Sequence, residues 1–189
     1  MGSISYLKDP GRTTDQELRA YLAGNLPTGH RVVAQATRSV YGSREWSRQL
    51  FAAVEDNAGA VSCHVLLGAS EQGHIVIKAL HESCGPGVHP DPPARVLAAL
   101  TPTDHEYAQV FRDELADALE RKTVAKALIG QVVEFDRPLG YGGGHANRTR
   151  FRLQSMTRFT LPDGPQRFRA PQGWWMRTYR VIPPADAAA

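Results

Sequence analysis

The sequence predicts an α+β protein: an antiparallel sheet with flanking helices, followed by a small β-barrel module of the SH3-like or OB-like kind. Segments of alternating apolar and polar residues, two capping boxes and a change of charge support this prediction. Residues 1–120 carry 10 Lys and Arg against 15 Asp and Glu, whereas residues 121–189 carry 12 against 4, which together give the net charge of +3. We therefore expect an acidic α+β domain at 1–124 and a basic β-barrel domain at 125–189 with a frayed C-terminal tail.

Helices are predicted at three places in the first domain. Thr14 and Glu17 have the spacing of a capping box, which begins a helix that ends near Gly24. A proline is tolerated in the first turn of a helix, so a short helix is expected at 93–100. Thr103 and Glu106 form a second capping box, and the apolar spacing after it predicts a helix to about residue 121.

Four extended segments are predicted in the first domain, at 31–41, 46–55, 60–67 and 74–82. The last two alternate cleanly, with one apolar set from Val61 to Leu67 and another from Ile75 to Ala79. A five-residue loop, 69–73, would bring both sets to the same side of a hairpin. We therefore expect an antiparallel meander with one buried face.

Short strands with Gly and Pro turns dominate the last third of the chain. They are predicted at 131–139, 148–161, 166–170 and 174–182. The Gly-rich segment 140–147 is predicted to be a flexible loop, because it lacks the Lys-Ser/Thr ending and the helix of a phosphate-binding P-loop. This spacing of strands is what suggests a small open barrel.

Three short motifs in the middle of the chain carry a resemblance. They are His81-Glu82-Ser83-Cys84-Gly85-Pro86, Pro93-Ala94-Arg95-Val96-Leu97 and Leu100-Thr101-Pro102-Thr103. In them the chain resembles an uncharacterised bacterial family of actinobacterial, plasmid and phage genomes, with the pattern Glu-Ser/Thr-x-Gly-Pro … Leu-Thr/Ser-Pro-Thr. That family also ends in a small β-module close to Tyr-x-Val-Ile, here 179–182. The resemblance implies a bacterial or mobile-element protein and a domain organisation, but no activity.

Arginines form the strongest physical signal in the basic domain. Arg148, Arg150 and Arg152 alternate with Thr149, Phe151 and Leu153, so a strand would place the three guanidinium groups on one face. Arginine favours bidentate contact with phosphate, and an aromatic ring beside it can stack on a base. The predicted nucleic-acid-binding residues are Arg148, Arg150, Arg152, Arg167, Arg169, Trp174 and Trp175. Two other interpretations stay open: the arginines dock on the acidic domain or on a protein partner, or they form a plain solvated surface.

A small enzyme is the alternative function, with a site around His81, Glu82, Cys84 and His89. Cys84 with a histidine base could act as a nucleophile. The structural interpretation of the same segment is a turn in which Glu82 or Ser83 satisfies backbone N–H groups. The His-x2-Cys-x4-His spacing lacks the fourth ligand of a structural zinc site, so we expect no metal and no cofactor.

Cysteine content and hydropathy bear on the cellular location. The two cysteines, Cys63 and Cys84, are expected to be reduced thiols. No segment approaches the roughly 20 apolar residues that cross a membrane. We therefore expect a cytoplasmic, non-catalytic protein that binds nucleic acid or a protein partner and no membrane.

Overall fold

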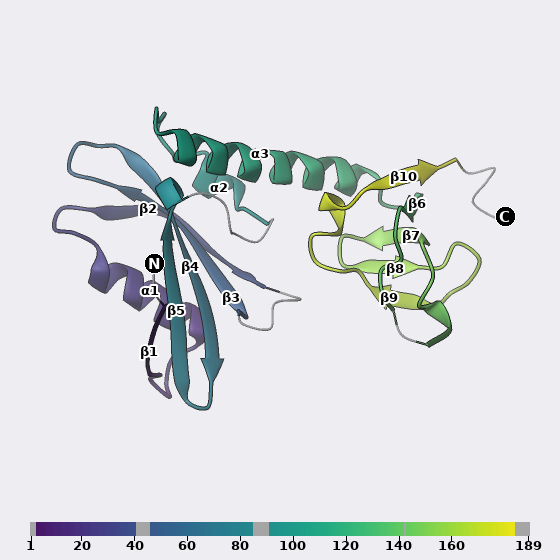
Figure 1. The fold of residues 1–189 in the computed structure, drawn as a ribbon, viewed down its shortest axis with the longest axis horizontal. Coiled ribbons are helices and arrows are strands. Elements are labelled where there is room, and N and C mark those ends of the chain that lie inside the picture. The colour runs from purple at the N-terminus through teal and green to yellow at the C-terminus, as the bar shows by residue number, and fades with distance from the viewer. Residues whose placement is uncertain (1–2, 41–45, 85–90, 142, 184–189) are drawn as a thin grey trace. The chain divides into compact units, whose positions relative to one another are not determined.

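The computed structural model describes residues 3–40, 46–84, 91–141 and 143–183. The chain divides into two compact units, Met1–Leu119 and Glu120–Ala189. Each unit is built on a five-stranded antiparallel sheet, and both sheets are drawn in Figure 1. Most of the tail predicted to be frayed lies outside the described residues. None of the described helices is long and apolar enough to cross a membrane.

The sheet of the first unit has the strand order β1-β5-β4-β3-β2. Its strands are β1 (Ser3–Leu7), β2 (Arg31–Ser39), β3 (Arg48–Glu55), β4 (Val61–Glu71) and β5 (His74–His81). The last four are the predicted strands and form the predicted meander. β1 was not predicted; it pairs along β5 and forms one edge of the sheet.

Helix α1 (Thr14–Asn25) covers one face of this sheet. Its N-cap is Thr13, whose side chain accepts a hydrogen bond from the backbone of Gln16, so the predicted capping box is displaced by one residue. Leu18 and Leu22 point into the cluster that includes Leu50 and Ile77. Gly68 on β4 permits this close approach, because a Cβ atom there would lie 2.9 Å from Leu18 Cδ2.

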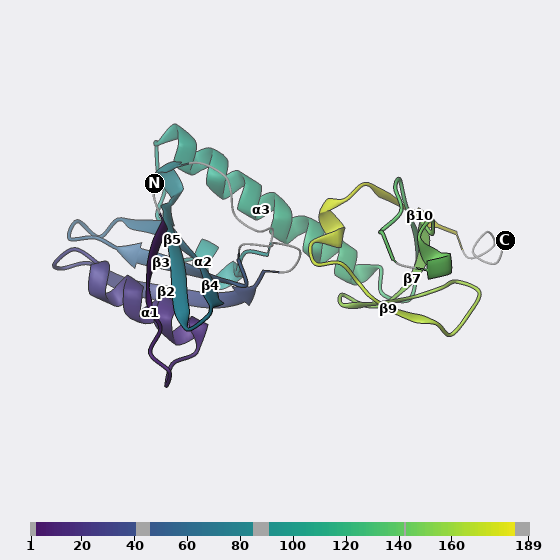
Figure 2. The same ribbon diagram turned by 60° about the horizontal axis from the view of Figure 1, so that its bottom comes forward.

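Helices α2 (Ala94–Leu97) and α3 (Glu106–Ala127) are drawn in Figure 2. They supply the apolar side chains that pack on the opposite face of the sheet. Val96, Phe111 and Leu115 pack there with Cys63 and its neighbours. The predicted second capping box is replaced by a local bond, in which the backbone N–H of His105 donates to the Thr103 hydroxyl at 3.2 Å. α3 continues past the predicted end at residue 121, and the division between the two units falls within it.

The β4–β5 hairpin corrects the predicted register. Glu71 pairs with His74, so the turn is only Gln72-Gly73, with left-handed φ values of 48° and 81°. Ile75 therefore pairs with Ser70 rather than Leu67, a shift of three residues that reverses the face. The Val61–Leu67 set faces α2 and α3, and the Ile75–Ala79 set faces α1. The sheet is thus buried on both faces, not on one.

The sheet of the second unit has the order β10-β6-β7-β8-β9. Its strands are β6 (Val132–Phe135), β7 (Arg150–Ser155), β8 (Arg158–Thr160), β9 (Arg167–Arg169) and β10 (Tyr179–Ile182). The strand predicted at 148–161 is in fact two strands with a reversal between them, and the Gly-rich segment contains a short 3-10 turn, η2 (Gly143–His145). β9 and β10 are the edges and do not pair with each other, so the expected barrel is not confirmed.

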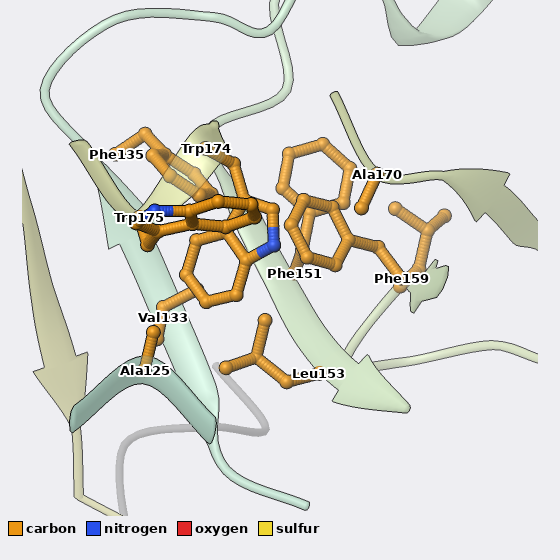
Figure 3. Packing of buried hydrophobic residues seen from close by; sticks show 10 residues of the cluster. Ala125, Val133, Phe135, Phe151, Leu153, Phe159, Ala170, Trp174 and Trp175 are labelled. Carbon is orange, nitrogen blue, oxygen red and sulfur yellow. The ribbon is translucent and has the colours of Figure 1, made fainter. Parts of the chain in front are cut away.

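An aromatic cluster forms the core of the second unit (Figure 3). Phe135, Phe151, Phe159 and Trp174 are all at most 2% exposed, and the indole N–H of Trp174 donates to the Met156 carbonyl at 3.0 Å. Trp174 and Trp175 belong to the short turn η3 (Trp174–Met176) and fill this core. The alternating aromatic and basic residues of this unit therefore separate into an aromatic interior and a basic exterior.

Candidate functional site

The outer face of the second sheet carries arginines from four strands. Across β7, β6 and β10, Arg150 lies opposite Glu134, and Glu134 lies opposite Arg180. The Arg150 Nε atom is 2.9 Å from one carboxylate oxygen of Glu134, and the Arg180 Nη2 atom is 2.6 Å from the other. Hydrogen bonds from Arg150 and Arg180 lower the pKa of the Glu134 carboxyl. One carboxylate therefore orders two guanidinium groups at this end of the face.

The rest of the same face is more basic. Arg152 lies opposite Thr160, which lies opposite Arg167 on the next strand, and Arg158 lies opposite Arg169. Alternation along the strands places Phe151, Phe159 and Phe168 on the other side, with the core. We call the following six residues the Arg face: Arg150, Arg152, Arg158, Arg167, Arg169 and Arg180. Glu134 is the one acidic residue among the described strand positions of this face.

The Arg face contains four of the five arginines predicted from the sequence. Arg148 is exposed but precedes β7, and its backbone N–H donates to the His145 carbonyl at 3.1 Å, so it belongs to the loop and not to the strand. Arg152 is half-buried and donates to the Gly130 carbonyl at 3.2 Å. Arg167 and Arg169 are exposed on edge strand β9.

The predicted base-stacking residues do not lie on this face. Trp174 is 0% exposed and Trp175 is 5% exposed, both within the aromatic core. A buried indole cannot stack on a base without opening the core, because the ring face is already covered by protein. Any contact with nucleic acid at the Arg face would therefore be made by arginine and short polar side chains.

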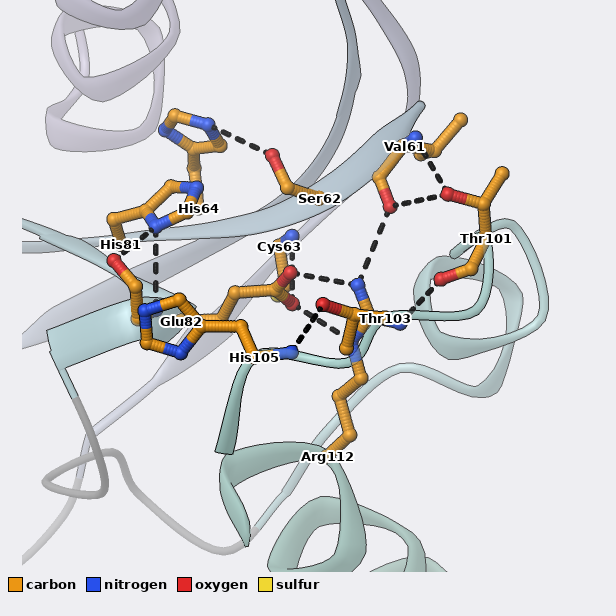
Figure 4. Close-up of polar contacts among 11 residues, drawn as sticks. Val61, Ser62, Cys63, His64, His81, Glu82, Thr101, Thr103, His105 and Arg112 are labelled. Atoms are coloured by element: carbon orange, nitrogen blue, oxygen red, sulfur yellow. Dashed lines mark hydrogen bonds and ion pairs between the residues drawn. The ribbon is translucent and has the colours of Figure 1, made fainter. Parts of the chain in front are cut away.

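Glu82 occupies a structural position at the end of β5 (Figure 4). Its carboxylate is 3% exposed and accepts hydrogen bonds from the Cys63 backbone N–H at 3.0 Å and from Arg112 at 2.9 and 2.6 Å. Arg112, from α3, also donates to the carbonyls of Thr101 and Val61. The carboxylate thus joins α3 to the sheet, and its acceptor sites are occupied by these donors rather than open to a substrate.

The histidines beside Glu82 form a separate group. The His81 Nδ1 atom is 2.7 Å from the Ser83 hydroxyl and accepts the Ser83 backbone N–H at 3.2 Å. The His64 ring meets His81 edge-on, with centroids 4.8 Å apart. Burial lowers the pKa of His64 to about 4 and also lowers the pKa of His81, so both rings are neutral near pH 7.

The two cysteines differ in environment. Burial raises the pKa of Cys63 to about 12, which leaves it an unreactive thiol within the core. Cys84 is exposed at the end of the turn, and His89 lies outside the described residues. Within the described ranges, no three His, Cys, Asp or Glu side chains are grouped to hold a metal ion. The structure therefore separates Glu82, held by Arg112, from His81, held by Ser83.

Two partners were missed at the level of sequence. Glu134 alternates with Val133 and Phe135, and this period of two could have placed it opposite the core, on the side of the arginines. Arg112 carried no such signal, because it is one charged residue on a helix rich in charges and lies 30 residues from Glu82.

Comparisons of the chain with protein-family models, curated proteins and solved structures give no match.

Proposed function

We propose that this protein binds nucleic acid without catalysing a reaction, through contacts between the Arg face and the phosphate backbone. The supporting observation is that six arginines share one face of a small sheet with a single acidic residue. Guanidinium groups bind phosphate oxygens in a bidentate manner, and contacts to phosphates position a protein without reading sequence. The resemblance to an uncharacterised bacterial family suggests a bacterial cell or a mobile element as the setting, and we propose a cytoplasmic location.

Double-stranded nucleic acid is the form that the face suits best. The remaining strand positions of the face are short or aliphatic, with Val132, Thr160 and Ile182 between the arginines. Non-specific single-strand binders stack bases on aromatic rings. The aromatic rings of this sheet lie on the core side, so the arginines would contact the regularly spaced phosphates of a duplex.

Fluorescence anisotropy with a labelled duplex over a series of salt concentrations tests this function. The variant Arg152→Gln/Arg169→Gln/Arg180→Gln removes three charges from the Arg face. Its affinity should fall for all duplex sequences alike, and the slope of log K against log salt should shrink by about two to three units, since each phosphate contact contributes about 0.9. Circular dichroism should show a folded chain, because Arg169 and Arg180 are exposed and the half-buried Arg152 loses one hydrogen bond, to the Gly130 carbonyl.

The matched control removes three exposed charges elsewhere, as Arg19→Gln/Arg31→Gln/Lys126→Gln. It should keep nearly the wild-type slope. Equal losses in the two variants would show that net charge, and not the Arg face, determines binding. Absence of salt-dependent binding by the wild-type chain at low salt would refute the nucleic-acid function, and an acidic protein partner would then become the better hypothesis for the face.

A catalytic role for the 81–84 turn has less support from the same geometry. The Glu82 carboxylate accepts hydrogen bonds from Arg112, and the His81 ring is hydrogen-bonded to Ser83. Neither arrangement leaves a nucleophile and a base facing a common open space.

A further inference from the structure

A shallow pocket opens beside the Arg face, where β7 turns into β8. Its volume is about 320 Å³, and its lining residues are Gln154, Ser155, Thr157, Arg158 and Arg167. Every one of these side chains can donate a hydrogen bond, and none carries a negative charge. The pocket is therefore chemically suited to an anion.

An irregularity in the strand pairing creates the pocket. The register between β7 and β8 shifts between Leu153 and Ser155, which leaves Gln154 as an extra residue. Such bulges bend a strand and redirect its side chains. The Gln154 side-chain amide donates to the Thr160 hydroxyl at 3.3 Å, and its second N–H remains available to a ligand.

The two hydroxyl groups of the pocket are also held in place. The Thr157 backbone N–H donates to the Ser155 hydroxyl at 3.2 Å, and the two hydroxyl oxygens are 3.3 Å apart. Only one of the two hydroxyl protons is used in that contact. The other can be donated to a bound oxygen.

The charges in this pocket lack the compensation seen elsewhere on the Arg face. Arg150 and Arg180 are both held by Glu134. Arg158 and Arg167 are exposed, and neither guanidinium group forms a hydrogen bond or ion pair with the part of the chain that the structure describes. Two guanidinium groups that line one pocket repel each other, and a bound anion with several acceptor oxygens would relieve this repulsion.

We propose that this pocket is the phosphate subsite of the Arg face, with Arg158 and Arg167 binding one phosphate group and the Ser155–Thr157 hydroxyls completing its shell. This inference rests on the proposed nucleic-acid function. The phosphate is either a diester of the duplex backbone or a monoester at a 5′ end, because both present tetrahedral oxygens to the same donors.

Anisotropy titrations with one duplex, prepared with and without a 5′-phosphate, separate these sources. The test variant is Arg158→Gln/Arg167→Gln, and the matched control is Arg152→Gln/Arg169→Gln, which removes the same charge from the same face outside the pocket. The test variant should lose at least about tenfold more affinity than the control, because charge-assisted bonds in a pocket exceed open-surface contacts. Equal losses would overturn the subsite.

The two duplexes then identify the phosphate. A terminal monoester predicts that the wild-type chain prefers the 5′-phosphorylated duplex by about tenfold and that the test variant loses this preference. If the subsite binds a backbone diester, the wild-type chain should bind both duplexes with equal affinity, and the test variant should still lose more affinity than the control variant.

Inorganic phosphate distinguishes a failure of the subsite from a failure of the proposed function. If the wild-type chain binds neither duplex, nuclear magnetic resonance titration with phosphate should still shift backbone amides of residues 154–158, and Arg158→Gln/Arg167→Gln should abolish the shifts. That result would retain an anion pocket while refuting nucleic-acid binding. Shifts spread over the whole surface, or none, would overturn the subsite as well.

Discussion

Replacing Arg112 with methionine should destabilise the first unit strongly. The Arg112 side chain is 13% exposed and meets the Glu82 side chain, which is 3% exposed, so both charges have lost most of their hydration. Methionine keeps much of the aliphatic volume but leaves the Cys63 backbone N–H, at 3.0 Å, as the one remaining donor to the Glu82 carboxylate among the described residues. The effect of the substitution therefore comes mainly from leaving the buried Glu82 carboxylate without its guanidinium partner.

The expected loss is about 3–5 kcal/mol of unfolding free energy, which is the usual cost of removing one member of a buried ion pair. The substitution removes the two hydrogen bonds between Arg112 and Glu82, of 2.9 and 2.6 Å. It also removes the hydrogen bonds from Arg112 to the Thr101 and Val61 carbonyls, and both losses contribute to the destabilisation. In the double variant Glu82→Gln/Arg112→Met no buried charge is left unpaired. Its loss should be smaller than the sum of the two single losses by about 1–3 kcal/mol.

Urea denaturation followed by far-ultraviolet circular dichroism measures these free energies, and hydrogen exchange at the Cys63 amide reports on the site itself. Arg19→Met, on the exposed surface of α1, is the control and should change stability by less than about 0.5 kcal/mol. A loss below about 1 kcal/mol for Arg112→Met, with unchanged exchange at Cys63, would refute the structural role of the pair. Glu82 would then become a candidate for chemistry again.

Two further predictions concern the first unit. Gly68→Ala should destabilise the first unit by about 1–3 kcal/mol in urea denaturation, because the new methyl group would lie 2.9 Å from Leu18 Cδ2. The control Gly24→Ala has open space around the new methyl group and should not destabilise the unit. Equal effects of the two variants would contradict the close approach of α1 to the sheet. The pKa of His64 falls from about 6.5 in the unfolded chain to about 4 in the folded one, so the unfolded state binds its proton first and stability declines as pH falls through this range. His64→Gln should make that decline shallower in denaturation measured across the same pH range, and an unchanged profile would show that the ring is solvated.

Local physical chemistry in the sequence was enough to predict most elements of the fold. Strands β2 to β5 follow from alternating apolar residues, because side chains of a strand point to opposite faces in turn. α1 follows from its cap and its apolar spacing. The same alternation predicted that Arg150 and Arg152 share a face, and the structure places both there. β1 escaped prediction because five residues at an edge give too short a pattern.

Contacts between distant residues decided the rest. The turn at Gln72-Gly73 set the register of the hairpin, and a shift by an odd number of residues moves every side chain to the opposite face. Trp174 and Trp175 lie between the basic residues Arg169 and Arg177, which suggested a surface position, yet both indoles pack with the phenylalanines in the core of the second unit. Glu82 has a structural role because α3 places Arg112 beside its carboxylate, where the two side chains form an ion pair. A period along the chain determines which side of an element a residue faces, but only the packing of elements determines what lies on that side.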